Sequence, residues 1–157
     1  MSIKNGLTVF IIFAAISMVP SSLRAQLSQG PLARAKAIKC TLPVMAVGTW
    51  GKDKPDVKVQ PSTHPTLEFE KINADEGTAV LKGDYGKYDI IVRYANGYLH
   101  FIQSFLDGPL YTTTVMEKTT ASGKFKAVHS RHEYTDVSLP TYTSSPEQYY
   151  GECEIVN

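Results

Sequence analysis

The chain has 157 residues, of which 43% are hydrophobic and 20% are charged, with 16 Lys and Arg against 15 Asp and Glu. Its near-neutral charge argues against a nucleic-acid binder, which usually carries a basic stripe, and its hydrophobic content excludes a disordered chain. The length suffices for one domain with a single core but not for two.

Residues 1–25 have the three-part pattern of a secretory signal peptide. Lys4 supplies a positive charge, residues 7–19 form an apolar run, and Ala25 is a small residue suited to the position before a cleavage site. The run is too short for a transmembrane helix, and no later run is long enough to span a bilayer. We therefore predict an exported protein, secreted or periplasmic, with an uncleaved N-terminal anchor as the alternative.

The rest of the chain divides into a leader and one folded domain. Residues 26–36 are expected to form a flexible leader, and residues 37–157 a single β-barrel domain. Residues 33–35 (Ala-Arg-Ala) fit the cleavage pattern better than Ala25 does, but they lie far from the apolar run. No membrane span is predicted once the signal peptide is removed.

The two cysteines stand near the start and the end of the mature chain. An even number of cysteines in an exported protein points to a disulfide, here between Cys40 and Cys153. Two separate buried thiols are the alternative, and two lone cysteines so far apart lack the spacing of zinc ligands. We predict the disulfide and no metal site.

From residue 37 onward apolar and polar residues alternate, as in strands that are buried on one face. No segment repeats apolar residues at helical spacing. Residues 51–65, which contain three prolines, are expected to form one long loop. The predicted strands cover residues 38–46, 66–72, 78–83, 88–94, 98–105, 110–116, 124–134 and 148–156.

Two turn signals predict which residues face each other across neighbouring strands. Asn96-Gly97 is the preferred pair for a two-residue hairpin turn, and Asp107-Gly108 gives the next turn if it also has two residues. Pro109 weakens this second assignment, because a longer loop would shift the pairs. The first turn pairs Tyr94 with Leu99, Val92 with Phe101, Arg93 with His100 and Ile91 with Ile102. The second pairs Phe105 with Leu110, Gln103 with Thr112, Phe101 with Thr114 and Leu99 with Met116.

These strands and turns predict an all-β fold, an antiparallel up-and-down meander of about eight strands that closes into a small barrel. Closure removes the two exposed edges of such a sheet. A Cys40–Cys153 bond would join the first strand to the last, as closure requires. A two-sheet β-sandwich is the alternative architecture.

A barrel of this size either holds one small ligand or is filled by its own side chains. If Phe125 and Ala127 face inward, His129 and Arg131 on the same strand follow them. Our first hypothesis is an interior site for a small, partly apolar molecule. Its candidate ligand-binding residues are Phe69, Tyr94, Phe101, Gln103, Phe105, Thr112, Thr114, His129 and Arg131.

Arg131 allows three interpretations. It could bind the carboxylate or phosphate of a ligand as a fixed donor. It could belong to a buried network in which Glu133 or a carbonyl neutralises it, or it could face solvent in the opposite register.

Catalytic signals are weak. His129 and Ser130 are neighbours on a strand, so their side chains diverge and cannot form a nucleophile–base pair by themselves. The pair Glu68 and Glu70 is typical of the solvated face of a strand. We predict no catalytic residues and no cofactor, and an enzyme is the less favoured interpretation.

Two segments outside the predicted strands suggest a second hypothesis. Residues 138–147 are rich in hydroxyl and aromatic side chains and lack Lys and Arg, a composition that suits recognition of another protein. Together with residues 51–65 they could form recognition loops on a filled barrel. The protein would then be an interaction module with an exported protein partner.

Overall fold

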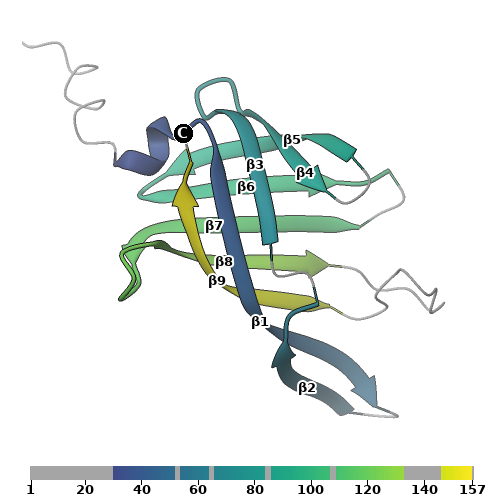
Figure 1. Cartoon of the computed structure of the whole chain (residues 1–157). Coiled ribbons are helices and arrows are strands. Elements are labelled where there is room, and N and C mark those ends of the chain that lie inside the picture. Colours follow the sequence, from purple (N-terminus) through teal and green to yellow (C-terminus); the bar gives the residue numbers. More distant parts are fainter. Residues whose placement is uncertain are drawn as a thin grey trace, which may run out of the picture.

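The computed structural model describes residues 30–51, 54–63, 66–83, 86–106, 109–132 and 146–156 (Figure 1). These residues contain no α-helix. They form one short 3₁₀ helix and nine strands: η1 (Pro31–Arg34), β1 (Ile38–Gly51), β2 (Lys54–Pro61), β3 (Thr66–Asn73), β4 (Thr78–Gly83), β5 (Gly86–Ala95), β6 (Tyr98–Ser104), β7 (Leu110–Thr119), β8 (Phe125–His132) and β9 (Glu147–Ile155).

All strand pairs are antiparallel, and the order along the sheet is β2-β1-β3-β4-β5-β6-β7-β8-β9. A further pairing of β1 with β9 closes strands β1 and β3 to β9 into a barrel, whereas β2 stays outside the closed ring. This confirms the predicted meander and excludes the two-sheet sandwich. Figure 1 shows β1 and β3 running steeply across the strands β5 to β8.

The Asn96-Gly97 turn has the geometry that its sequence predicts. Both residues have positive φ, 52° and 80°, as a type I′ turn requires. Tyr94 faces Leu99 and Val92 faces Phe101, which confirms the first set of predicted pairs.

The second set of predicted pairs is wrong by one residue. Ser104, not Phe105, faces Leu110, and Phe101 faces Thr113. The connection is a longer loop, in which the backbone N–H of Phe105 donates to the carbonyl of Pro109 at 3.0 Å. A one-residue shift moves every side chain of a strand to the other face, so the odd-numbered residues of β7 point inward.

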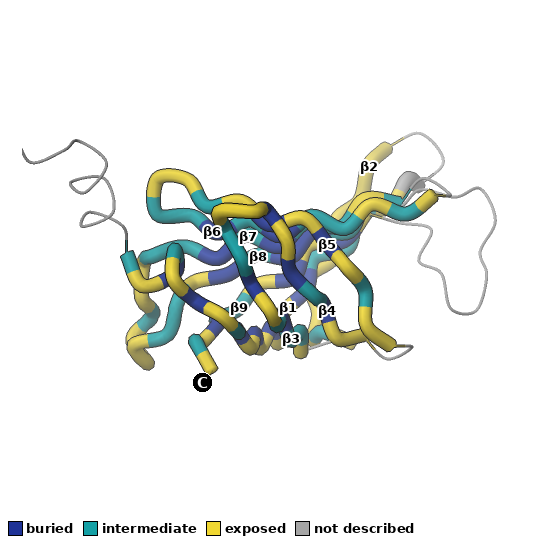
Figure 2. Tube along the Cα trace, turned by 90° about the horizontal axis from the view of Figure 1, so that it is seen from above, coloured by how far each residue is buried: buried dark blue, intermediate teal, exposed yellow. Residues whose placement is uncertain are grey.

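The predicted long loop over residues 51–65 is also wrong, because most of it is strand β2. β2 pairs with the second half of β1, from Lys54 opposite Gly51 to Pro61 opposite Val44. The prolines that indicated a loop are compatible with an edge strand, because a residue there can lack an N–H without losing a hydrogen bond to a neighbouring strand. All eight residues of β2 are exposed, and Figure 2 shows β2 projecting from the barrel.

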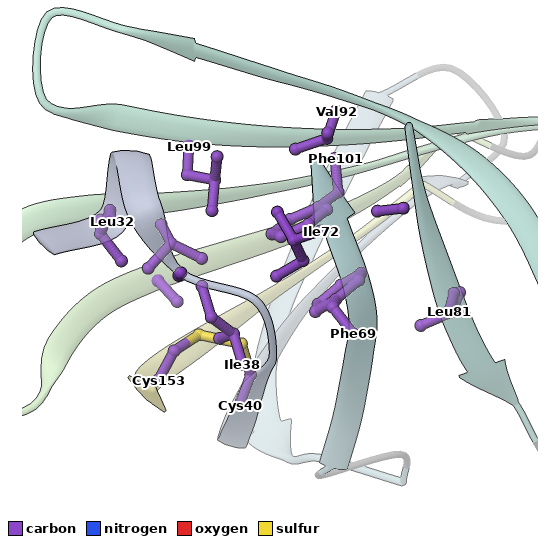
Figure 3. Close-up of a cluster of buried hydrophobic side chains, with 14 of the residues drawn as sticks. Leu32, Ile38, Cys40, Phe69, Ile72, Leu81, Val92, Leu99, Phe101 and Cys153 are labelled. Carbon is purple, nitrogen blue, oxygen red and sulfur yellow. A yellow bond between two sulfur atoms is a disulfide. The ribbon is translucent and has the colours of Figure 1, made fainter. Parts of the chain in front are cut away.

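The disulfide prediction is confirmed. Cys40 and Cys153 lie opposite each other on β1 and β9 and are bonded across a sequence separation of 113 residues. Both are fully buried in the core (Figure 3). The disulfide thus joins the two strands that close the barrel.

Part of the segment expected to be a flexible leader packs against the barrel. Leu32 of η1 is fully buried in the same cluster as Ile38 and Leu99 (Figure 3). The backbone N–H of Leu32 donates to Glu117 Oε1 at 3.0 Å, and that of Gly30 donates to the Tyr94 hydroxyl at 3.4 Å. Residues 30–36 therefore differ from the expectation, because one apolar side chain and two backbone donors find partners on the barrel.

Candidate functional site

An aromatic pair occupies the middle of the barrel. The rings of Phe69 on β3 and Phe101 on β6 stack with their centroids 3.9 Å apart. The cavity beside them has a volume of about 10 Å³, which is room for roughly one water molecule. Its lining residues are Phe69, Leu81, Ile90, Phe101, Gln103, Tyr111, Thr113 and His129.

A charged pair lies on the inner face of β8 and β9. Arg131 and Glu147 are opposite each other in the strand pairing, and Arg131 Nη1 is 3.4 Å from Glu147 Oε2. Only 17% of the Arg131 side chain and 4% of the Glu147 side chain are exposed. Arg131 Nη2 also donates to the Tyr111 hydroxyl at 2.9 Å, and the guanidinium lies 4.7 Å from the centre of that ring.

The next inner row adds Thr113, His129 and Tyr149 to this network. Thr113 Oγ1 and His129 Nδ1 are 2.9 Å apart, and the His129 ring lies 5.5 Å from that of Tyr149. The Tyr149 hydroxyl donates to Glu147 Oε2 at 2.5 Å. Burial raises the pKa of Tyr149, and its hydrogen bond to the Glu147 carboxylate raises that pKa further. Tyr149 therefore stays a neutral donor at physiological pH.

This network supports the second interpretation of Arg131, a buried structural ion pair. A partly buried guanidinium is stable because an internal carboxylate and a hydroxyl accept its hydrogen bonds. The carboxylate that pairs with Arg131 is Glu147, and Glu133, the partner considered from the sequence, lies outside the described residues. Glu147 was missed because the sequence placed it in a loop, although its spacing of two from Tyr149 indicates the same inner face.

The candidate ligand-binding residues do not form one pocket. Phe69 and Phe101 fill the core, and Gln103 lines the small cavity. Phe105 packs edge-on against Tyr111 at 5.0 Å, whereas Tyr94 lies near η1. His129 and Arg131 belong to the polar network. Among the described residues, the cavity beside Phe69 and Phe101 is smaller than the small molecule of the first hypothesis would need.

Thr112 and Thr114 point outward, which corrects their assignment to the interior. Thr114 Oγ1 is 3.0 Å from His100 Nδ1 on the outer face of β6. The one-residue shift of β7 is the cause. It brings Tyr111 and Thr113 inside instead, two residues that the predicted register had placed on the outer face.

The outer surface of the barrel has two different walls. On β3, β4 and β5, together with the first part of β1, oppositely charged side chains alternate. Lys39 lies 3.1 Å from Glu68, and Lys82 lies 2.5 Å from Glu70. Hydrogen bonds from Lys39 and Lys82 lower the pKa of Glu68. We call this surface the charged wall.

The second wall runs over β6, β7, β8, β9, the second half of β1 and β2, and it carries two rows without Asp, Glu, Lys or Arg. Strand pairing places the members of each row side by side. We call these two rows together the uncharged wall; the next outer row of β8 and β9 carries Lys126 and Glu152. One row is Ile102, Thr112, Ser130, Gln148, Ala46 and Val59, and the other is His100, Thr114, Val128, Tyr150, Val44 and Pro61.

Several members of the uncharged wall are large, apolar and exposed. Val44 and Tyr150, which face each other on β1 and β9, are 41% and 42% exposed, and Val59 on β2 is 72% exposed. Such residues in one continuous patch, without charge, are typical of interaction surfaces.

The predicted recognition loop over residues 138–147 lies outside the described residues except for Pro146 and Glu147. The carbonyl of Pro146 accepts from the N–H of Gly48 at 2.8 Å, so the end of this segment is fixed on β1. Among the residues that the structure describes, no cluster of His, Cys, Asp and Glu could hold a metal ion. Within the same residues, no helix has the length and hydropathy to cross a membrane.

Comparison of the chain with known protein families, curated proteins and solved structures finds no match.

Proposed function

We propose that this chain is an exported protein-interaction module, in which the filled barrel is a scaffold and the uncharged wall binds a protein partner. The observation that carries the proposal is the separation of charge on the outer surface. A barrel exposed to water on all sides would be expected to carry charge throughout, as the charged wall does.

The filled interior supports this choice over an interior ligand. Because the cavity has room for about one water molecule, a small molecule could enter only if Phe69 or Phe101 moved out of the core. A packed core and a disulfide between β1 and β9 make the wall rigid. A rigid surface loses little conformational entropy on binding.

The polar and apolar side chains of the uncharged wall indicate what kind of surface would bind there. Thr112, Thr114 and His100 offer hydrogen bonds, and Val44 with Tyr150 offers apolar area. A protein surface of neutral hydroxyl, amide and apolar groups would match this mixture, whereas a nucleic acid would find no cations there. Binding should therefore depend only weakly on salt concentration.

Export is the second part of the proposal. It is supported by the Lys4, 7–19 and Ala25 pattern and by a disulfide, which persists in oxidising compartments. N-terminal sequencing of the protein from the medium or periplasm should start at Gln26. An intact Met1 on soluble protein inside the cell would contradict export.

Photo-crosslinking in the producing cell tests the wall. Benzoylphenylalanine in place of Tyr150 should crosslink one protein, and the same group at Thr112 should crosslink that protein too. Lys87 on the charged wall is the control position and should give no such product. The purified partner should bind the wild type, and Val44→Lys should weaken binding by roughly tenfold or more.

Two outcomes would contradict the interaction module. Equal crosslinking from positions 87 and 150 would show that the partner does not prefer the uncharged wall to the charged wall. A small molecule that stays bound to the purified protein in native mass spectrometry would revive the interior site.

A further inference from the structure

β2 is the end strand of the sheet that the structure describes, and its edge away from β1 pairs with none of the described strands. Among the described residues, β2 pairs with β1 and with no other strand. Val57 and Val59 in its middle are 65% and 72% exposed. An exposed edge of this kind can add another strand through its backbone groups.

The two prolines of β2 indicate which backbone groups face the free edge. Pro55 and Pro61 have no N–H, and prolines within a sheet are tolerated where the missing N–H would point away from the neighbouring strand. Residues alternate along a strand, so Val57 and Val59 share this orientation. Their N–H and C=O groups therefore point away from β1.

The charged residues of β2 are complementary to those of a second copy of β2 that runs antiparallel to it. Asp56 and Lys58 stand on either side of Val57. In an antiparallel pair of two copies with Val57 opposite Val57, each Asp56 lies opposite the Lys58 of the other copy. An antiparallel pair centred on Asp56 or on Lys58 would instead place two like charges opposite each other. A pair centred on Val59 would leave Asp56 and Lys58 without an oppositely charged residue opposite them.

We propose that β2 pairs with β2 of a second copy of this chain, antiparallel, with Val57 on the two-fold axis. The two Val57 residues exchange two backbone hydrogen bonds, and each Val59 N–H donates to the carbonyl of the other copy's Pro55. Because both copies use the same edge, the contact closes as a symmetric dimer.

The apolar side of this seam continues the uncharged wall. Val57 and Val59 lie on the same face as Ala46 and Val44, their neighbours on β1. The dimer would therefore join the uncharged walls of two barrels along one sheet. This inference goes beyond the proposed function, and self-association can be measured without any other partner.

Sedimentation of the mature protein tests the dimer. The contact is shorter than a standard interface, so we expect a dissociation constant on the order of 10 µM. Asp56→Lys places lysines opposite Lys58, and Lys58→Asp places aspartates opposite Asp56. Each variant alone should dimerise more than about tenfold more weakly. The double variant Asp56→Lys with Lys58→Asp should dimerise like the wild type.

Mixing the two single variants gives a second readout. Each Lys at position 56 of one chain meets an Asp at position 58 of the other, so a heterodimer should form although neither variant pairs with itself. Lys54→Glu is the matched control, because Lys54 would lie opposite Gln60, and it should leave dimerisation nearly unchanged.

Three results would overturn the inference. The wild type could remain a monomer up to about 1 mM, the double variant could fail to restore the dimer, or Lys54→Glu could weaken it as much as Asp56→Lys does. Circular dichroism would verify that each variant is folded. A monomeric wild type that still crosslinks its partner through Tyr150 would reject only the dimer.

Discussion

Arg131 and Glu147 face each other across β8 and β9, and one carboxylate oxygen of Glu147 accepts from both Arg131 and the Tyr149 hydroxyl. Glu147 is the first residue of β9 and Arg131 lies next to the last residue of β8. The network therefore holds together the ends of two strands whose connection, residues 133–145, lies outside the described residues.

Arg131→Met should destabilise the protein by about 3–5 kcal/mol, because it leaves the Glu147 carboxylate buried without its cation. Urea unfolding curves of the variant and the wild type give this difference. Adding Glu147→Gln to Arg131→Met should recover part of the loss, since the unpaired charge is then removed. Unchanged stability of the single variant would show that Arg131 faces solvent.

Tyr149→Phe should reduce the sensitivity of the protein to alkaline pH. The folded-state pKa of Tyr149 is raised above its ordinary value of 10.0, so the folded state binds more protons than the unfolded state above that pH. Stability is therefore complete below pH 10.0 and falls as the pH rises from there through the folded-state pKa. Urea midpoints on both sides of pH 10.0 should show a smaller fall in the variant. A fall as large as in the wild type would contradict the assignment.

Replacing Cys40 and Cys153 together by alanine should cost about 4–5 kcal/mol, the loop-closure contribution expected for a bond that spans 113 residues. Guanidinium unfolding without reductant measures the cost. Peptide mapping of the wild type under the same conditions should recover the two cysteine peptides linked. A wild type whose cysteines both alkylate after unfolding would refute the bond.

Leu32→Ala should destabilise the protein by about 2–5 kcal/mol, because Leu32 is fully buried against the barrel core. Arg34→Ala in the same short helix is the matched control, since its side chain is exposed, and should change stability by no more than about 0.5 kcal/mol. Thermal or urea unfolding of both variants decides the point. Equal stability of the wild type and Leu32→Ala would mean that η1 does not pack in solution.

The sequence predicted features that depend on neighbouring residues. Asn96-Gly97 specified its turn because both residues adopt positive φ readily, and the alternation of β5 and β6 agreed with that turn. The pairing of Cys40 with Cys153 followed from the even number of cysteines in a chain with an export pattern. The eight strands of the closed barrel and the inner face of β8 were predictable for the same reason, since period two is visible within each strand.

The remaining errors came from connections whose length depends on the rest of the fold. Asp107-Gly108 resembles a tight turn, but the Phe105 to Pro109 hydrogen bond makes a longer loop and moves Thr112 and Thr114 outside. β2 was missed because its prolines fit an edge strand as well as a loop. Glu147 was missed because the sequence placed it in the loop over residues 138–147, and only the strand pairing brings it opposite Arg131.

The pairing of β1 with β9 also sets the order of events during synthesis. Of the strands that the structure describes, β1 is made first and β9 last, so hairpins from β3 to β8 can form while the barrel is still open. The bond from Cys40 cannot form until Cys153 has been made, 113 residues later. Contacts so distant in sequence form slowly. Formation of this bond therefore reports that the chain has been made at least as far as β9, and a chain that ends before Cys153 has no intramolecular partner for the Cys40 thiol.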